Sequence, residues 1–215
     1  MRIAIIGAGN VGASLGKGWA ISGHPIIYGV PDPTNRKYAS IAEAAKRAEV
    51  VGVADAVDRA DAIVLAVPWD AAPNAISACG NLSGRLLIDA TNPLKGGAEG
   101  LELALGFSTS GGEEVARMAP GASVFKTMNQ VGFPVMSDTQ GYPARPVMFV
   151  AGDDADRKPQ VLALVTDLGF EAVDAGPLRR ARLLEPYALL WIDQAINHGA
   201  PTDSAFAFMR KGRTK

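Results

Sequence analysis

Two hydrophobic patterns alternate along most of the chain. Short, nearly continuous apolar runs such as "AIVLAV", "LLIDA" and "VMFVAG" are typical of strands that are covered by helices on both faces. Between these runs lie amphipathic stretches with helical periodicity. The pattern predicts an α/β fold with a doubly wound, mostly parallel sheet. We expect seven strands, at Arg2–Ile6, Pro25–Val30, Ala62–Ala66, Arg85–Asp89, Ser123–Lys126, Val147–Ala151 and Glu171–Asp174.

Two stretches between the predicted strands stand out. Before the last strand, Val161, Leu164 and Val165 fall on one helical stripe, and Gly169 lies where a C-terminal cap belongs. Residues 90–122 instead form a long, glycine-rich excursion after a strand. Stretches of that length inside a compact domain are more often functional than mere connections.

The chain ends in an apolar tail, "LEPYALLWIDQAINHG". From Tyr187 to Ile192 it is apolar all round, which predicts a helix buried against the sheet or against a partner subunit. Pro186 should start or kink this helix, and Gly199 should end it. We therefore expect one domain over residues 1–178 and a small C-terminal helical segment over residues 179–215 that covers a substrate crevice.

Composition narrows the class of protein. The 215 residues carry a net charge of −1, so the chain has no basic field to hold nucleic acid. A single cysteine, Cys79, is typical of a protein in a reducing compartment, and the two histidines are too far apart for a His-based metal site. No apolar stretch approaches the ~20 residues of a membrane span. We expect a cytoplasmic protein that binds no metal, nucleic acid or membrane.

The first predicted strand runs into a glycine motif. Gly7-Ala8-Gly9-Asn10-Val11-Gly12 matches G-x-G-x-x-G and opens a predicted helix. Gly7 permits the tight turn, Gly9 lets a pyrophosphate approach the backbone, and Gly12 lets helix and strand pack closely. Free N–H groups at the helix N-terminus then meet the phosphates. The motif predicts a Rossmann-type dinucleotide site that includes Asn10 and Val11.

Two further loops follow predicted strands. They are "AVPWD", with Val67 and Pro68, and "DATNPL", with Thr91 and Asn92. Ligands of such sheets bind outside the carboxyl ends of the strands. We expect these loops to meet the glycine motif at one crevice and to approach the nicotinamide.

The stretch "YGVPDPTNRK" should read the adenosine ribose, because it ends the second predicted strand. Asp32 is suited to the ribose hydroxyls of NAD. Arg36 and Lys37 are suited to the 2′-phosphate of NADP, or they are simply solvated loop charges. The residues alone leave both cofactors open.

Catalytic side chains are scarce. No tyrosine has a lysine four positions later, His24 and His198 are typical of helix-end or packing residues, and Cys79 is typical of a small buried residue. Reducing a carbonyl requires a proton donor, whereas a flavin or deazaflavin ring takes up the charge itself. The loop "FKTMNQVGFPVM" is rich in apolar and amide side chains, which are suited to contact a flavin or deazaflavin ring. We expect the C-terminal tail to cover this loop. Its candidate substrate residues are Met128, Asn129, Gln130 and Phe133, with Tyr187 and Trp191 from the tail.

Several motifs taken together resemble the coenzyme F-420-dependent NADP oxidoreductase family, which is related to the cytoplasmic domain of membrane ferric reductases. They are "MRIAIIGAGNVGASLGKG", "DAIVLAVPWDA", "LLIDATNPL", "TSGGEEVA", "VFKTMNQVG", "PVMFVAGDD", "LVTDLGFEAVDAGPL" and "ARLLEPYALLWI". The resemblance implies a Rossmann domain, direct hydride transfer between NADP and F-420 or flavin, and a homodimer. Related sequences tend to carry arginine where this chain has Pro31.

Other functions stay open at this point. A small imine or carbonyl reductase could use Asn129, Tyr142 or Tyr187 to handle the proton. A non-catalytic sensor could bind NAD(P) and report its state to a partner. A second anion site at "TSGGEEVA" also stays open, because Ser110, Gly111 and Gly112 precede a predicted helix whose free N–H groups could hold a phosphate. Glu113 and Glu114 argue against it, since they already complement the helix dipole.

Overall fold

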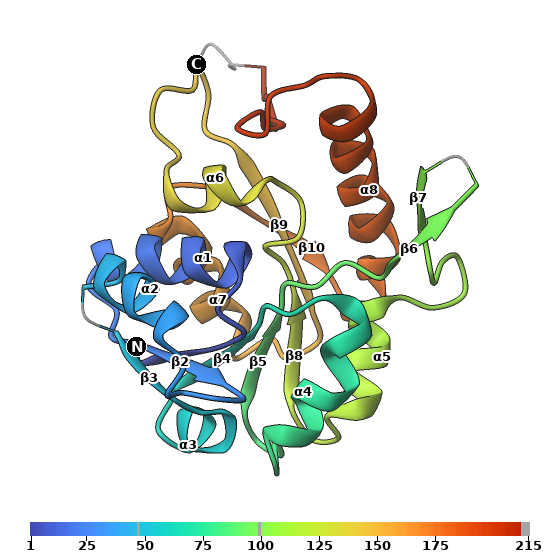
Figure 1. Ribbon diagram of the computed structural model, residues 1–215. Helices are drawn as coiled ribbons and strands as arrows, with labels where there is room; N and C mark the ends of the chain where they lie inside the picture. Colours follow the sequence, from blue (N-terminus) through green and yellow to red (C-terminus); the bar gives the residue numbers. More distant parts are fainter. Residues whose placement is uncertain (47, 99, 212–215) are drawn as a thin grey trace.

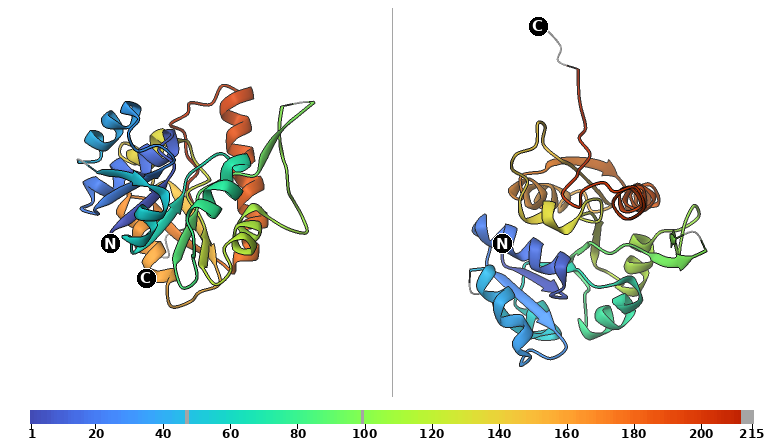
Figure 2. Two further views of the ribbon diagram at one scale, coloured as in Figure 1. Left: turned by 60° about the horizontal axis from the view of Figure 1, so that its bottom comes forward. Right: turned by 45° about the horizontal axis from the view of Figure 1, so that its top comes forward.

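The core of the fold is an eight-stranded sheet with helices on both faces (Figures 1 and 2). The computed structural model describes residues 1–46, 48–98 and 100–211. The strands are β1 (Ile3–Ile6), β2 (Ile26–Val30), β3 (Glu49–Gly52), β4 (Ala62–Leu65), β5 (Leu86–Asp89), β6 (Leu94–Gly97), β7 (Gly100–Leu103), β8 (Ser123–Lys126), β9 (Val147–Gly152) and β10 (Glu171–Gly176). The α-helices are α1 (Asn10–Ile21), α2 (Ala39–Ala44), α3 (Val53–Asp58), α4 (Ala72–Ala78), α5 (Gly111–Met118), α6 (Phe133–Ser137), α7 (Lys158–Asp167) and α8 (Ala181–Asn197). The Rossmann-type α/β fold with a helical C-terminal segment is confirmed.

Strand order places the ligand edge of the sheet. The order is β10-β9-β8-β5-β4-β1-β2-β3, and all neighbours from β3 to β8 run parallel. β9 runs antiparallel to β8, and β10 runs parallel to β9. The carboxyl ends of β1 and β4 therefore lie side by side where the winding reverses, which is where dinucleotides bind in such folds.

All seven predicted strands are present, with ends that differ by two residues at most. Three strands were missed. β3 is a four-residue edge strand that begins at the exposed Glu49 and is otherwise only half-buried, so it lacks an apolar run. β6 and β7 form an antiparallel hairpin within the glycine-rich excursion. Figure 1 shows this hairpin projecting beside α8, away from the sheet.

Two apolar layers hold the helices to the sheet. One contains Leu15 and Trp19 of α1 together with residues of α6 and α7, and the other lies under α3, α4 and α5. Trp19 is fully buried, and its indole N–H donates to the carbonyl of Leu164 in α7 at 2.8 Å. α7 confirms the predicted stripe, and Gly169 follows it with a φ of +89°.

Of the two roles predicted for Pro186, starting the helix or kinking it, the first is wrong. Helix α8 starts at Ala181, and Pro186 lies inside it. The short 3-10 turn Leu178–Arg180 leads directly into the helix. Gly199, with a φ of +70°, follows the end of α8 as expected. Nothing tests the proposed domain boundary after residue 178, which stays a prediction.

Among the residues that the structure describes, no helix combines the length and the apolar character needed to cross a membrane.

Candidate functional site

The glycine motif forms the turn between β1 and α1. Gly7 has a φ of +101°, and a Cβ there would lie 2.5 Å from the carbonyl oxygen of Ala66. A Cβ on Gly12 would lie 2.1 Å from the carbonyl oxygen of Gly7. Gly9 differs, since a Cβ there would meet no atom within 4 Å. Gly7 and Gly12 therefore allow close packing, whereas Gly9 faces open space.

That open space belongs to a crevice of about 320 Å³ at the carboxyl edge of the sheet. Three turns line it, after β1, β4 and β5. The lining residues are Gly9, Asn10, Val11, Ala66, Val67, Pro68, Trp69, Ala90, Thr91 and Asn92. The structure thus brings together seven residues that the sequence assigned to cofactor binding. No residue in this lining has an ionisable side chain.

Five predicted cofactor residues lie outside this lining. Gly7 and Gly12 pack the glycine turn, and Asp32, Arg36 and Lys37 lie in and just after the loop that follows β2. Asp32 accepts hydrogen bonds from the hydroxyl of Thr34 at 2.6 Å and from its amide at 3.1 Å. The hydroxyl bond is the main reason why the pKa of Asp32 lies below its usual value. Arg36 and Lys37 follow on an exposed 3-10 turn, and the Lys37 ammonium lies 4.9 Å from the centre of the Tyr38 ring.

Hydrogen bonds with buried side chains hold the turn after β5. Asp89 is fully buried, and its Oδ1 accepts from the amide of Thr91 at 2.9 Å and from the Thr91 hydroxyl at 2.7 Å. Asn92 donates from Nδ2 to the carbonyl of Asn129 at 3.0 Å, and Asn129 donates back to Oδ1 of Asn92 at 3.1 Å. The crevice turn is therefore tied to the loop after β8.

A buried lysine lies beneath this turn. Lys126 is fully buried, and its Nζ lies 2.9 Å from Asp89 Oδ2, 3.1 Å from Glu185 Oε1 and 2.6 Å from the Thr91 carbonyl oxygen. Burial opposes the charge on Lys126, but the two carboxylates outweigh it and hold its pKa above the usual value. Sequence reasoning did not assign a role to Lys126, Asp89 or Glu185. Their signal is a charged residue inside or at the end of an apolar run, as in "VFK" and "LLEPY".

The anion site that stayed open at "TSGGEEVA" is wrong, because the chain fills it with its own carboxylate. Glu185 of α8 accepts from the amides of Gly111 and Gly112 at 2.9 and 3.0 Å. Ser110 caps the same helix by accepting from the Glu113 amide at 3.2 Å. These N–H groups at the N-terminus of α5 therefore already have partners.

The loop after β8 is only partly available to a substrate. Met128 is buried and has a φ of +62°, a conformation that is strained for a residue with a side chain. Gln130 exchanges two hydrogen bonds with the backbone of Phe149, at 2.9 and 3.0 Å, and so extends the β8–β9 pairing. This geometry argues against Gln130 as a substrate contact. Phe133 is 42% exposed at the start of α6.

The tail covers this loop through aromatic contacts. Trp191 is buried, and its indole N–H donates to the carbonyl of Ser204 at 2.9 Å. A Cβ on Gly132 would lie 2.6 Å from the Trp191 ring, so α8 and the loop after β8 are in close contact. Tyr187 packs edge-on against Phe149, and burial raises the pKa of its hydroxyl to about 12.

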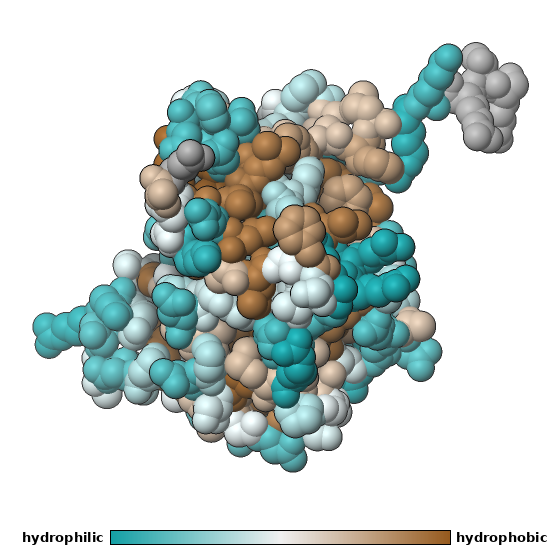
Figure 3. All heavy atoms as spheres, turned by 90° about the vertical axis from the view of Figure 1, so that its right-hand side faces the viewer, coloured by the Kyte–Doolittle hydropathy of each residue, from teal (hydrophilic) through white to brown (hydrophobic). Residues whose placement is uncertain are grey.

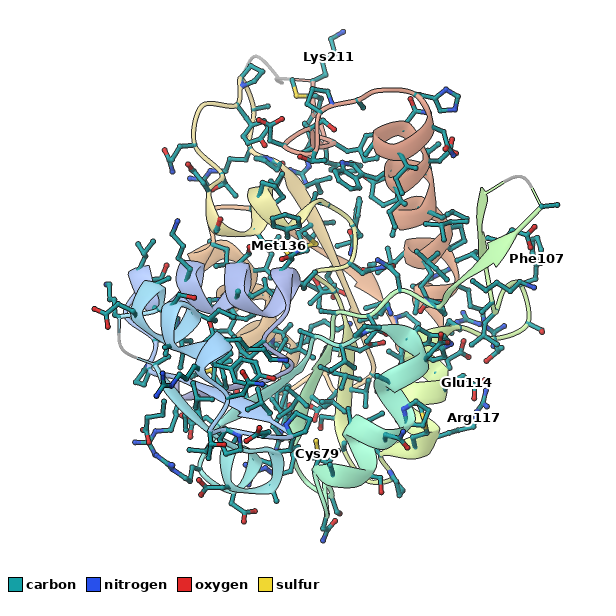
Figure 4. The ribbon with its side chains drawn as sticks, viewed as in Figure 1. Cys79, Phe107, Glu114, Arg117, Met136 and Lys211 are labelled. Atoms are coloured by element: carbon teal, nitrogen blue, oxygen red, sulfur yellow. The ribbon has the colours of Figure 1, made fainter. Side chains whose placement is uncertain are left out.

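The remaining candidates have other contacts. The Tyr142 hydroxyl donates to the carbonyl of Asp203 in the tail. The Nε2 atom of His24 lies 2.9 Å from Oδ2 of Asp167. His198 follows the end of α8, and its Nε2 atom lies 3.1 Å from Oδ2 of Asp193. Cys79 lies at the end of α4, at the bottom of the molecule in Figure 4, and burial raises the pKa of its thiol to about 11. None of these side chains lines the crevice.

Comparison with known proteins agrees with this geometry. Residues 2–93, which include all three crevice turns, match the family described as "NADP oxidoreductase coenzyme F420-dependent". A crystal structure of a protein from Arthrobacter sp. FB24, provisionally named an F-420-dependent NADP reductase, is 28% identical with a TM-score of 0.88. The match covers 98% of this chain and 100% of that one. The resemblance predicted from the sequence is confirmed.

More distant relatives extend the comparison. The metalloreductase STEAP3 of Rattus norvegicus is 25% identical over 190 residues, which is 87% of this chain and 36% of the relative. The chain thus spans little more than a third of that protein. An imine reductase from Myxococcus stipitatus in complex with NADP⁺ is 20% identical with a TM-score of 0.68, over 93% of this chain and 63% of that one. This last likeness shows the fold alone.

Proposed function

We propose that this chain, a relative of the coenzyme F-420-dependent NADP oxidoreductases within the NAD(P)-dependent oxidoreductases, transfers hydride directly between NADP(H) and a flavin-like or deazaflavin ring. The observation that carries the proposal is the lining of the crevice, which offers glycine, apolar, hydroxyl and amide groups and no ionisable side chain. A carbonyl acceptor needs a positioned acid, whereas a ring acceptor takes up the charge itself. The work of the protein is then to stack two rings and exclude water.

The nucleotide would lie across the three turns. The pyrophosphate would meet the N–H groups at the start of α1, above Gly9, where no atom of the protein fills the space. The nicotinamide would lie between the turn of Val67 and Pro68 and the turn of Thr91 and Asn92. When bound, it supplies or accepts the hydride, and the chain's own residues hold it in place.

We favour NADP over NAD. Asp32 is engaged by Thr34 through Oδ1, which leaves it less free to accept from ribose hydroxyls. Arg36 and Lys37 are exposed on the 3-10 turn that follows the loop after β2. They are close in sequence to the loop that would contact the adenosine ribose and its 2′-phosphate. With Pro31 in place of arginine, we expect the preference to be weaker than in related sequences.

The second ring would lie against Asn129 and Met128, near Phe133, with Tyr187 and Trp191 of the tail covering it. Support comes from the hydrogen bonds between Asn129 and Asn92 and from the contact of Trp191 with this loop. The hydride acceptor would thus approach the nicotinamide from the side of β8.

A direct absorbance assay of NADPH oxidation tests the proposal. NADPH is mixed with the protein and with F-420, flavin mononucleotide, ferric citrate or a cyclic imine, and loss of the nicotinamide band is followed. We expect turnover with a ring acceptor and none with the imine. Turnover with the imine alone would identify an imine reductase instead, and tight NADPH binding without turnover on any acceptor would favour a redox sensor.

We also propose that the chain acts as a homodimer, with the cytoplasm as its expected location. Among the described residues, half of the exposed large apolar side chains lie on α8 and the adjoining hairpin and loop: Leu101, Phe107, Leu183, Leu190 and Ile196. Figure 3 shows an apolar area on this side of the molecule, and Figure 4 shows Phe107 projecting from it. A surface of this kind is typical of a protein interface.

A further inference from the structure

The buried cluster under the crevice is unbalanced in charge. Lys126 faces the carboxylates of Asp89 and Glu185, and all three side chains are essentially inaccessible to solvent. A buried charge is costly unless it is paired and hydrogen-bonded. The additional negative charge is compensated by the start of α5, where the amides of Gly111 and Gly112 donate to Glu185. The cluster therefore joins β5, β8, α5 and α8 in one polar network.

This network holds every polar group of Thr91. Asp89 accepts from the Thr91 amide and hydroxyl, and Lys126 donates to the Thr91 carbonyl. Thr91 lines the crevice, whereas Asp89 and Lys126 do not. The conformation of this part of the crevice is thus set by two side chains that lie behind it.

We propose that Lys126 is a positioning residue, which fixes the Thr91–Asn92 turn for the nicotinamide and, through Glu185, makes that turn depend on the seating of α8. This inference rests on the proposed function, because it assigns the turn to the nicotinamide end of a bound dinucleotide. The C-terminal helix then does more than cover the acceptor, since its carboxylate completes the support of the cofactor site.

A purely structural ion pair makes a different prediction. Loss of such a pair lowers the free energy of unfolding but leaves the crevice unchanged in the molecules that remain folded. A positioning role instead predicts a local change at residues 89–93 in the folded protein. The matched control is Lys158, which bonds to the carboxylate of Asp174 at 2.9 Å and to the Gly176 carbonyl at 3.0 Å, outside the crevice.

The experiment compares Lys126→Met with Lys158→Met in the full chain. Amide hydrogen exchange at residues 89–92 should accelerate about tenfold or more in the Lys126 variant alone, because the turn opens locally. Should Lys126→Met fail to fold, the double variant Asp89→Asn with Lys126→Met removes one charge of each sign and serves the same purpose. Unchanged exchange at residues 89–92 in a folded Lys126 variant overturns the proposal.

Ligand measurements separate this inference from the proposed function. In the Lys126→Met variant, the affinity for adenosine 2′,5′-bisphosphate, which lacks the nicotinamide, should stay within about twofold of wild type. Its kcat should fall about a hundredfold, because the nicotinamide is misplaced by roughly an ångström. The emission maximum of bound NADPH should also shift from its wild-type wavelength. A wild-type protein that binds no NADPH refutes the proposed function, and the exchange measurement still decides the role of Lys126.

Glu185→Gln tests the coupling to α8. The variant keeps the Lys126–Asp89 pair and removes the second carboxylate. We expect faster exchange both at residues 89–92 and at Gly111 and Gly112. Faster exchange at Gly111 and Gly112 alone would show that Glu185 only caps α5, and would overturn the coupling.

Discussion

Gly9 and Gly12 lie three residues apart in one motif, yet they meet different surroundings. A side chain on Gly12 would collide with the backbone of Gly7, whereas a side chain on Gly9 would project into the crevice. Gly9→Val should therefore keep the fold and raise the dissociation constant for NADPH by about a hundredfold, or roughly 2.7 kcal/mol. Titration calorimetry measures this effect.

Gly12→Val is the informative comparison. It forces a Cβ to 2.1 Å from a carbonyl oxygen, so the free energy of unfolding should fall by more than about 3 kcal/mol, above the usual range for overpacking. Urea denaturation of both variants decides the matter. Normal NADPH binding by Gly9→Val would show that the glycine turn is structural.

Cofactor preference can be tested at Arg36. If it contacts the 2′-phosphate, Arg36→Ala should weaken NADPH binding about tenfold to a hundredfold, because one charge-assisted hydrogen bond contributes ~1.5–3 kcal/mol, and should leave NADH binding unchanged. Pro31→Arg should have the opposite effect on NADPH. Tighter binding of NADH than of NADPH, with no response to Arg36→Ala, would show that Asp32 reads the ribose of NAD.

Sequence reasoning worked best for residues whose role depends on backbone conformation. The crevice glycines and the turns after β4 and β5 were predicted because turn and strand signals are local. The roles of Lys126 and Glu185 were not predicted, since they are 59 residues apart and meet only when α8 docks. A local pattern cannot show which distant carboxylate a buried lysine will meet.

The helices and strands show the same difference: elements with a local sequence signal were predicted, and those that depend on distant contacts were not. Most of the predicted strands had an apolar run, while β3 gains its stability from pairing with β2 along Ile27–Val30. The start of α8 was left open, because a proline can begin a helix or kink it and the local pattern does not show which. The anion site failed for a related reason, because an isolated helix N-terminus gives no sign that another helix supplies its anion.

The contact between α5 and α8 should depend on pH. Arg182 of α8 donates two hydrogen bonds to Glu113 of α5, at 2.7 and 2.8 Å. The bonds from Arg182 are the main reason why the pKa of Glu113 lies below its usual value. The folded pKa lies below the unfolded one, near 4.3, so this stabilisation is present above about pH 4.3 and is lost as the pH falls through the folded pKa.

Melting temperatures of wild type and Glu113→Gln should accordingly differ most near pH 7 and converge as the pH is lowered through the folded pKa of Glu113. Glu102→Gln is the control, since Glu102 forms only an exposed 3.8 Å pair with Lys95 in the hairpin. A difference that stayed constant between these pH values would show that the ionised carboxylate is not what joins the two helices.

At the scale of the molecule, α8 carries apolar side chains that the fold leaves uncovered. Leu183, Leu190 and Ile196 are 61%, 51% and 64% exposed. The loop after β7 adds Phe107, which is fully exposed and has a φ of +53°. A closed homodimer requires one self-complementary surface on both copies.

Leu183 and Leu190 are seven residues apart and share one face of α8, whereas Ile196 lies six residues farther on and about 120° around the helix. Antiparallel packing of two copies of α8 across the shared face would place Leu183 of one copy against Leu190 of the partner subunit. Since one copy supplies both residues, no second patch is needed for the interface to close.

Leu190→Glu should therefore convert a dimer into a monomer. An uncompensated charge buried in an interface costs roughly 3–5 kcal/mol, so the dissociation constant should rise by about a hundredfold or more. Sedimentation velocity over a range of protein concentrations measures it, and NADPH affinity should stay unchanged because Leu190 does not line the crevice. Ile21→Glu is the matched control, since Ile21 is 59% exposed at the end of α1. A wild-type protein that stays monomeric, or equal dissociation of the Ile21 variant, would rule out α8 as the dimer interface.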